Sequence, residues 1–278
     1  MKTSRKITIL LLAGALSSCG GSNYFEPMAS KNSDEALYED ALKLVDGQRY
    51  DEALAKIAEM SSAAQGGDDV VLTKAGIYAG KCGLNFLTFV DNIDGSGTPF
   101  NLFKSGFTGV SVDVAHCQTA QDLIETFGTT GIQRLSRLGS LRGNNANTFM
   151  AVLGMSKIGA QLKAKEDDDP AYNACSDLTV GTDSEVAQIG TGFALLLDNF
   201  AAISANLSGS TSTLLDDLND SCQLMTPNPC SITSPADTAW TDPMVQLAIK
   251  ALVRSDTVGV QNCSADPMHP FHPFDCCP

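Results

Sequence analysis

The chain has 278 residues and a formal net charge of −14, with 43% hydrophobic and 18% charged residues. A chain with that share of hydrophobic residues can bury a core, which argues against intrinsic disorder as its main state. A strongly acidic surface repels phosphate backbones and anionic headgroups. The composition therefore argues against nucleic acid as a partner and against membrane attachment through a basic patch.

The first 18 residues have the organisation of an export signal. Lys2, Arg5 and Lys6 form a basic start, and Ile7 to Leu16 is an apolar run. A run of about ten residues is too short to span a bilayer as a stable helix but suits a secretory signal. The sequence therefore predicts a leader over residues 1–18 that is cleaved after export.

The end of this leader is followed by a cysteine in a characteristic context. Leu16-Ser17-Ser18-Cys19 leads into the Gly/Ser-rich stretch Gly20-Gly21-Ser22. This pattern resembles the lipobox of bacterial lipoproteins, in which small residues precede a cysteine that is lipidated and becomes the new N-terminus. The resemblance implies lipid on Cys19, a flexible tether over residues 19–33 and a stable membrane anchor. Gly20 stands where an Asp would retain a lipoprotein at the inner membrane, which favours the outer membrane. An ordinary signal peptide with a coincidental cysteine is the alternative.

Eight cysteines remain when Cys19 is set aside for lipid. An even number of cysteines in an exported chain indicates disulfides. Cys222 and Cys230 bracket a Pro-containing loop and are the best local pair. Adjacent Cys276 and Cys277 should bond to different partners because a vicinal disulfide is strained, and Cys263 is a candidate for one of them. The disulfide candidates are Cys82, Cys117, Cys175, Cys222, Cys230, Cys263, Cys276 and Cys277.

The Cys/Pro-rich tail, residues 256–278, also contains soft metal ligands. His269 and His272 precede the two adjacent cysteines at plausible reach for a metal ion. Prolines interrupt this run, however, and the C-x-x-C knuckle of a structural zinc site is absent from the sequence. We therefore expect a tail pinned by disulfides, with no metal and no cofactor.

Residues 34–90 have the periodicity of helices. Apolar side chains recur at helical spacing on both sides of Gly47, a natural stop. Two short helices joined across such a turn form a helical hairpin. The residues expected to pack this hairpin are Leu37, Ala41, Leu44, Tyr50, Ala53 and Ile57.

The hairpin resembles one tetratricopeptide repeat (TPR). Its first helix has large, small and large residues in the right order, and Tyr50-Asp51-Glu52-Ala53 matches the Y-x-E-A step, although Asp40 stands where a Leu is usual. Residues 72–80 would open a second repeat, with Gly76, Gly80 and Gly83 as a small-residue stripe. The resemblance implies stacked hairpins that present a concave surface. An unrelated helical hairpin is the alternative.

The remaining chain is expected to continue the same domain. Residues 91–118 are expected to be a loop-rich connection with a brief strand-like alternation at 110–114, and residues 119–255 a helical bundle. Capping boxes are expected at Thr119-x-x-Asp122 and Thr182-x-x-Glu185, and Pro243 suits the first position of the last helix. The predicted fold class is all-α: a helical bundle or a short array of TPR-like hairpins, stapled by disulfides. The longest apolar stripe, typical of core packing, is Val186, Ile189, Phe193, Leu197, Phe200, Ile203 and Leu207.

Motifs of common enzymes are absent from the sequence. It has no G-x-S-x-G, S-x-x-K, H-E-x-x-H or G-x-x-x-x-G-K-[ST] pattern, and only three His. His116-Cys117 is the one neighbouring base and nucleophile, but adjacent residues rarely face each other, and Cys117 is expected in a disulfide. We therefore predict no catalytic residues.

The sequence as a whole predicts a non-enzymatic lipoprotein of the cell envelope. Its expected partners are the membrane, through the N-terminal lipid, and another envelope protein. One alternative is an accessory lipoprotein of a solute transporter, because the T-components of TRAP transporters combine a lipid anchor with TPR-like helices. A second alternative is an envelope enzyme that uses carboxylates.

Overall fold

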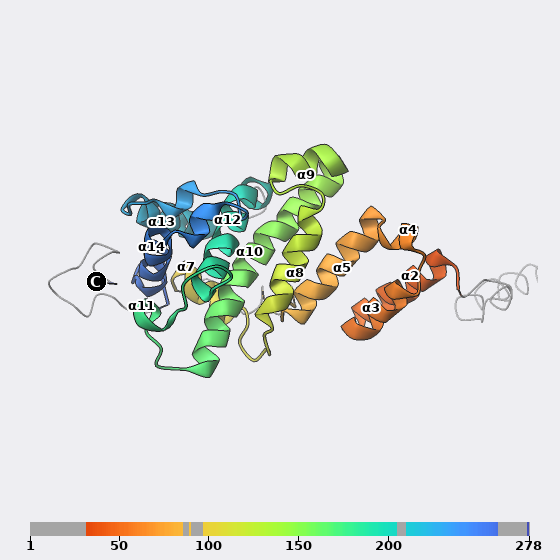
Figure 1. Ribbon diagram of the computed structural model, residues 1–278, viewed down its shortest axis with the longest axis horizontal. Helices are drawn as coiled ribbons and strands as arrows, with labels where there is room; N and C mark the ends of the chain where they lie inside the picture. Colours follow the sequence, from red (N-terminus) through yellow and green to blue (C-terminus); the bar gives the residue numbers. More distant parts are fainter. Residues whose placement is uncertain (1–31, 86–88, 90–96, 205–209, 261–276, 278) are drawn as a thin grey trace, which may run out of the picture.

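Every regular element that the computed structural model describes is a helix (Figure 1). Together with the disulfides given below, this confirms an all-α fold stapled by disulfide bonds. The described residues are 32–85, 89, 97–204, 210–260 and 277. The helices are α2 (Asp34–Asp46), α3 (Tyr50–Ala58), α4 (Ser62–Gln65), α5 (Asp68–Lys81), α7 (Pro99–Ser105), α8 (Val114–Glu125), α9 (Gly131–Leu138), α10 (Ser140–Asp168), α11 (Ala174–Asp177), α12 (Glu185–Ser204), α13 (Ser210–Gln223) and α14 (Pro243–Arg254), with two 3-10 helices, η2 (Pro229–Ser231) and η3 (Thr238–Thr241).

The N-terminal hairpin is formed by α2 and α3. Ser33 caps α2 by accepting a hydrogen bond from the backbone N–H of Ala36 at 3.2 Å. The six side chains expected to pack the hairpin belong to one apolar group, which we call the N-terminal cluster. Leu37, Ala41, Ala53 and Ile57 are buried in it, Leu44 and Tyr50 are partly buried against it, and Met60, Val70 and Ile77 complete it.

Helix α5 is buried on two faces. Val70 and Ile77 belong to the N-terminal cluster, whereas Ala75 and Ala79 belong to a second cluster shared with α8 and α10. A helix that packs on both sides has little room for a polar face. Helix α5 therefore joins the hairpin to the rest of the molecule, as Figure 1 shows.

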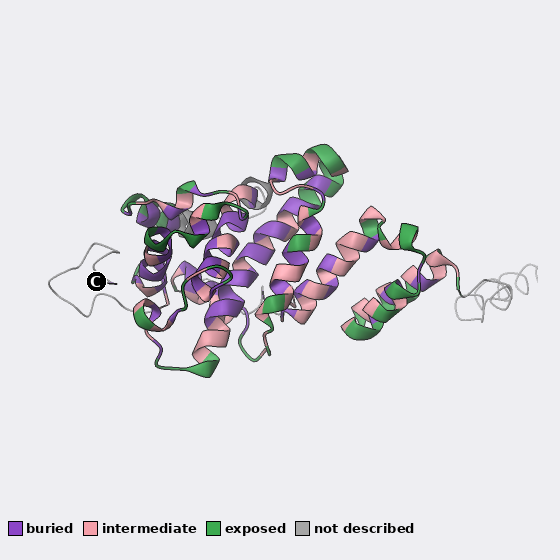
Figure 2. Cartoon of the chain, viewed as in Figure 1, coloured by how far each residue is buried: buried purple, intermediate pink, exposed green. Residues whose placement is uncertain are grey.

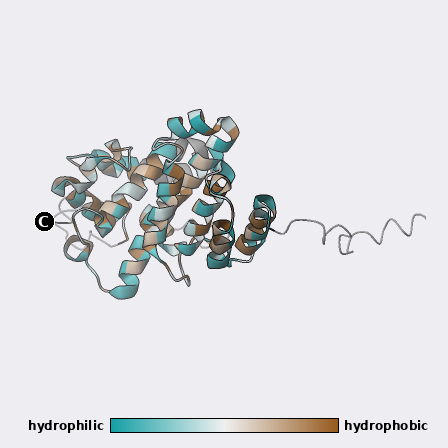
Figure 3. Cartoon of the chain, turned by 45° about the vertical axis from the view of Figure 1, so that its right-hand side comes forward, coloured by the Kyte–Doolittle hydropathy of each residue, from teal (hydrophilic) through white to brown (hydrophobic). Residues whose placement is uncertain are grey.

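The long helices pack largely in chain order. Helix α3 lies against α5, α5 against α8, α8 against α10, and α10 against α12, which in turn contacts α14. Such nearest-neighbour packing is typical of arrays of helical hairpins. Buried residues are concentrated in α10, α12 and α14 (Figure 2), and apolar residues gather between the long helices (Figure 3).

Helices α10 and α12 approach each other closely where they cross. A Cβ added to Gly192 of α12 would lie 2.9 Å from the carbonyl oxygen of Gly154 in α10. Two glycines thus let the helix backbones touch. Of the predicted apolar stripe, Val186, Ile189 and Phe193 are buried and Leu197 is partly buried, and the side chains of Phe200, Ile203 and Leu207 lie outside the described part of the structure.

Both predicted capping boxes are wrong. Thr119 lies inside α8, where its hydroxyl donates to the backbone carbonyl one turn earlier at 3.2 Å. Helix α12 is capped by Ser184, whose hydroxyl oxygen accepts from the backbone N–H of Ala187 at 3.2 Å, and not by Thr182. The structure has a capping box at Thr130 and Gln133 instead, at the start of α9. The three-residue spacing alone does not identify the start of a helix, because a hydroxyl can also bond back to the preceding turn.

The connection expected to be loop-rich, residues 91–118, contains α7 and the first turn of α8. Pro99 occupies the first turn of α7, and four of its residues are buried: Pro99, Phe100, Leu102 and Phe103. A short helix buried nearly all round shows no clear apolar period, which is why the pattern missed it. No strand is present at 110–114: residues 110–113 are irregular and Val114 begins α8. Residues 91–96 of this connection lie outside the described part of the chain.

The last helix begins where the sequence predicted. Asp242 caps α14, its carboxylate accepting from the backbone N–H of Met244 at 2.7 Å, and Pro243 follows at the first helical position. Trp240 packs against Gly190 of α12, where an added Cβ would overlap the indole ring. The indole N–H donates to the Ser234 carbonyl at 2.9 Å, so the buried ring keeps its polar group bonded.

Candidate functional site

Three disulfides join helices and loops of the described structure. Cys222–Cys230 is the local pair that the sequence predicted, and Cys277 bonds to Cys175 and so not to its neighbour Cys276. Cys82–Cys117 links the end of α5 to α8 across 35 residues of sequence. Cys263 and Cys276, like Cys19, lie outside the described residues.

The neighbouring residues His116 and Cys117 do not form a catalytic pair. Cys117 is fully buried in the disulfide with Cys82. The His116 ring lies beside Tyr78, with ring centroids 5.6 Å apart, and its Nε2 is 3.4 Å from the carboxylate of Asp113. With its sulfur bonded, Cys117 has no thiolate to offer as a nucleophile.

Metal ligands do not gather in the described part of the chain. Within it, no group of three or more His, Cys, Asp or Glu residues is placed to hold a metal ion, and no helix is long and apolar enough to cross a membrane. His269, His272 and Cys276 of the alternative metal site lie outside that part.

An apolar pocket of about 420 Å³ opens between α5 and α10. Its size falls within the range of about 300–1,000 Å³ that is usual for small-molecule sites. Asn145 and Thr148 add polar groups to a wall that is otherwise apolar. The pocket is lined by Gly76, Ala79, Leu84, Asn145, Thr148, Phe149 and Val152.

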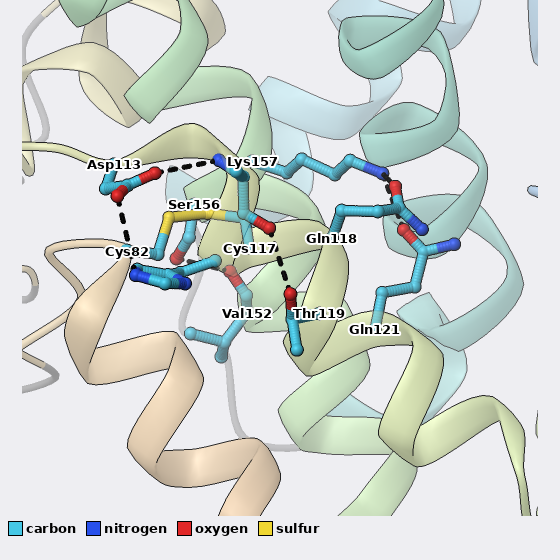
Figure 4. The surroundings of a disulfide bond; sticks show 11 residues. Cys82, Asp113, Cys117, Gln118, Thr119, Gln121, Val152, Ser156 and Lys157 are labelled. Atoms are coloured by element: carbon cyan, nitrogen blue, oxygen red, sulfur yellow. Dashed lines mark hydrogen bonds and ion pairs between the residues drawn. A yellow bond between two sulfur atoms is a disulfide. The ribbon is translucent and has the colours of Figure 1, made fainter. Parts of the chain in front are cut away.

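A buried lysine forms a polar centre between α8, α10 and α12. Lys157 of α10 is 2% exposed, and its Nζ lies 2.6 Å from Gln118 Oε1, Gln121 Oε1 and Thr191 Oγ1. An ammonium has three N–H donors, so each meets one acceptor. The Thr191 hydroxyl donates to the Gln188 carbonyl at 3.1 Å, which leaves its oxygen free to accept from Lys157. Figure 4 shows the lysine side chain reaching the two glutamines.

The two glutamines are held in the orientation that suits the ammonium. Gln118 Nε2 donates to Asp122 at 2.7 Å, and Gln121 Nε2 donates to Glu125 at 2.7 Å. Because each amide nitrogen is bound to a carboxylate, each amide oxygen faces Lys157. The lysine is therefore connected to two carboxylates through neutral amides, without the direct contact of a salt bridge.

Burial lowers the pKa of Lys157 to about 7. The charges of Glu125, Asp122 and Asp183 oppose this shift, with Glu125 contributing most. Burial also raises the pKa of Glu125, a shift opposed by its hydrogen bond from Gln121. Both groups are thus pushed towards their neutral forms, as expected where water is excluded from separated charges.

A second buried cation fixes the short helix α9. Arg134 is fully buried and donates from Nε to Asn147 at 2.8 Å and from Nη1 to the Gly128 carbonyl at 2.8 Å. Its Nη2 donates to Asp198 at 3.2 Å and Asn199 at 2.6 Å. This network bonds α9 to α10 and α12. Arg134 pairs directly with a carboxylate, so it has a structural role that Lys157 does not share.

Sequence reasoning singled out neither cation. A signal for Lys157 was present in the sequence. It follows Leu153 by four residues and Met150 by seven, so on a helix it shares a face with these two apolar residues. A charged residue in such a position must be buried with partners or be drawn out to solvent. Arg134 gave no comparable signal, because its partners come from three segments separated in the sequence.

Comparisons with known proteins found no matching family model, no matching curated protein and no matching solved structure.

Proposed function

We propose that this chain is a lipid-anchored cell-envelope protein that binds an apolar group of an envelope partner or ligand and catalyses no reaction. The observation that carries the binding role is the apolar pocket between α5 and α10. Leucine, valine and phenylalanine side chains with few polar groups suit an aromatic or aliphatic group. Asn145 and Thr148 would orient that group by hydrogen bonds.

Two features support a location outside the cytoplasm. The three disulfides are of a kind that persists in oxidising compartments. The basic and apolar leader with the Leu16-Ser17-Ser18-Cys19 segment supplies the export signal and the lipidation site. A mature protein whose tether ends at residue 33 would place the hairpin α2–α3 nearest to the membrane.

Anchoring is tested by metabolic labelling with radioactive palmitate. The wild-type protein should take up label and fractionate with membranes, and Cys19→Ala should lose both properties. Ser22→Ala, a change in the tether, is the matched control and should behave like the wild type. Absence of label from the wild type, or unchanged fractionation of Cys19→Ala, would refute the anchor.

Binding at the pocket is tested by filling it. Gly76 lines the pocket, and a Cβ added there meets no atom within 4 Å, so Gly76→Leu should occupy the cavity without disturbing the packing of α5. The control is Gly66→Leu. Gly66 is exposed and lies outside the pocket, and a Cβ added there makes only ordinary van der Waals contacts.

Partners are captured by crosslinking whole envelopes, purifying the protein and identifying the captured molecules by mass spectrometry. Gly76→Leu should lose the partner that the wild type and Gly66→Leu retain. Equal recovery with all three proteins would place the binding surface elsewhere. Recovery of a substrate-binding protein would favour the transporter alternative, for which the hairpin α2–α3 is the structural support.

A further inference from the structure

We propose that Lys157 is an internal proton-binding site. Its amine takes up and releases one proton while the helices stay packed, and its charge controls how firmly α8 is held against α10 and α12. This inference concerns the centre formed by Lys157, Gln118, Gln121 and Thr191, and it does not depend on the anchoring or binding role proposed above.

The centre can satisfy both protonation states of the amine. The ammonium donates to all three oxygens at 2.6 Å. A neutral amine has two N–H donors and one lone pair. It can keep both glutamine oxygens and accept from Thr191, whose hydroxyl needs only to rotate away from the Gln188 carbonyl. Proton loss therefore leaves no buried group of the centre without a partner.

The glutamines cannot make the same adjustment. Their amide nitrogens are bound to Asp122 and Glu125, so their oxygens continue to face the lysine in either state. Hydrogen bonds to a charged donor are stronger than those to a neutral one. These bonds favour the ammonium, but the lowered pKa means that its lost hydration outweighs them. Separation of α8 would rehydrate the amine, so α8 is held least firmly while the amine is charged and more firmly once the proton leaves.

The charged groups around the centre are known. Asp122 and Glu125 on α8 and Asp183, in the turn before α12, all favour the ammonium, whereas burial disfavours it. These opposed effects place the titration in the neutral range. Gln118 and Thr191 are only partly buried and Asp122 is exposed, so two of the side chains that bond the amine also reach solvent. A proton can therefore exchange without unfolding of the helices.

The test is a pH titration of the protein with isotope-labelled lysine, followed by NMR at the carbon next to the amine. One lysine signal should titrate with a midpoint of about 7. This signal should be missing from Lys157→Met and present in Lys163→Met, a matched change on the same helix. A signal for Lys157 that titrates at the ordinary pKa of a free lysine would overturn the proposal.

The second readout is hydrogen–deuterium exchange of the α8 backbone, corrected for the intrinsic effect of pH on exchange. As Lys157 loses its proton, exchange in α8 should fall, by about tenfold per pH unit above the midpoint, because opening of α8 rehydrates the amine and takes up a proton. Lys157→Met should show no such fall. Equal pH dependence in the two proteins would refute control of α8 by the lysine charge.

A further variant keeps the proposal testable if Lys157→Met does not fold. Thr191→Val preserves the shape of the side chain but removes an acceptor that the ammonium uses. The midpoint of the Lys157 signal should fall by about one pH unit, because the charged form loses more than the neutral form. An unchanged midpoint would show that the three-acceptor centre does not set the proton affinity.

Discussion

Replacing Lys157 by Met should abolish a large pH dependence of the protein's stability. Burial lowers the pKa of Lys157 from its ordinary 10.5 to about 7 in the folded protein. Between these values the unfolded chain binds more protons than the folded chain, so the free energy of unfolding rises with pH. Below about pH 7, the buried charge of Lys157 lowers the free energy of unfolding the most. Above about pH 10.5, Lys157 is neutral in both states and this destabilisation is absent.

The magnitude follows from the size of the shift. A difference of about 3.5 pKa units corresponds to about 5 kcal/mol in total. For a folded pKa of about 7, about 3 kcal/mol of this develops between about pH 7 and pH 9.5. The wild type should therefore gain about 3 kcal/mol relative to Lys157→Met over this interval.

The assay is equilibrium unfolding in urea with the disulfides intact, at both pH values. Groups that do not interact with Lys157 titrate alike in the two proteins, so their contributions cancel in the difference between them. Any constant effect of the substitution, such as the loss of the donors to Gln118, Gln121 and Thr191, also cancels when the two pH values are compared. The quantity to compare is the free energy of unfolding of the wild type minus that of Lys157→Met. If this difference stays constant with pH, or falls as pH rises, the pKa of Lys157 is not lowered. Lys163→Met serves as the control for a lysine lost from α10.

Three further outcomes are expected. Gly76→Ala should stabilise the protein by about 1 kcal/mol in urea unfolding because the new methyl meets only open space, whereas Gly80→Ala should destabilise it by about 1–3 kcal/mol because the methyl would overlap the Tyr50 ring. Arg134→Met should cost about 3–5 kcal/mol by leaving the Asp198 carboxylate without its cation, and the amides of α9 should exchange faster than those of α14. Alkylation of the unreduced, denatured mature protein should label no thiol by mass spectrometry, and a labelled cysteine would contradict complete pairing.

The parts of the fold that the sequence predicted are those set by local interactions. The hairpin α2–α3 has apolar residues at helical spacing on one face of each helix, and α14 has the Asp242-Pro243 start that caps and initiates a helix. Cys222 and Cys230 are only eight residues apart, so their pairing needed little knowledge of the fold. In each case the relevant partners are near one another along the chain.

The parts that the sequence could not predict depend on distant partners. Cys175 and Cys277 are separated by 102 residues, and no spacing rule selects that pair from the other combinations. The three acceptors of Lys157 come from two helices, and only the packing of α8 and α12 against α10 brings them together. The proton-binding centre therefore exists only in the folded chain.

The glycines in and just after α5 also have roles that the sequence alone could not predict. The sequence presented Gly76, Gly80 and Gly83 as one stripe that permits close approach. In the structure, Gly80 receives the Tyr50 ring, Gly76 faces the open pocket, and Gly83 has a φ of +107° just beyond the end of α5. Identical residues at regular spacing thus have three different roles, which are decided by what packs beside each one.

Because α5 is buried on two faces, it should transmit force between the hairpin α2–α3 and the rest of the molecule. A force applied at the N-terminal end, as by an anchor that moves against the rest of the protein, passes first into the hairpin α2–α3 and then through α5. The N-terminal cluster is small, so the hairpin should peel away while α5 still rests on α8. Beyond that point the disulfide between Cys82 and Cys117, which are 35 positions apart in the sequence, keeps the segment between them from extending. The hairpin α2–α3 is thus the part of the fold that should separate first under such a force, and the Cys82–Cys117 disulfide limits how far the chain can extend after that.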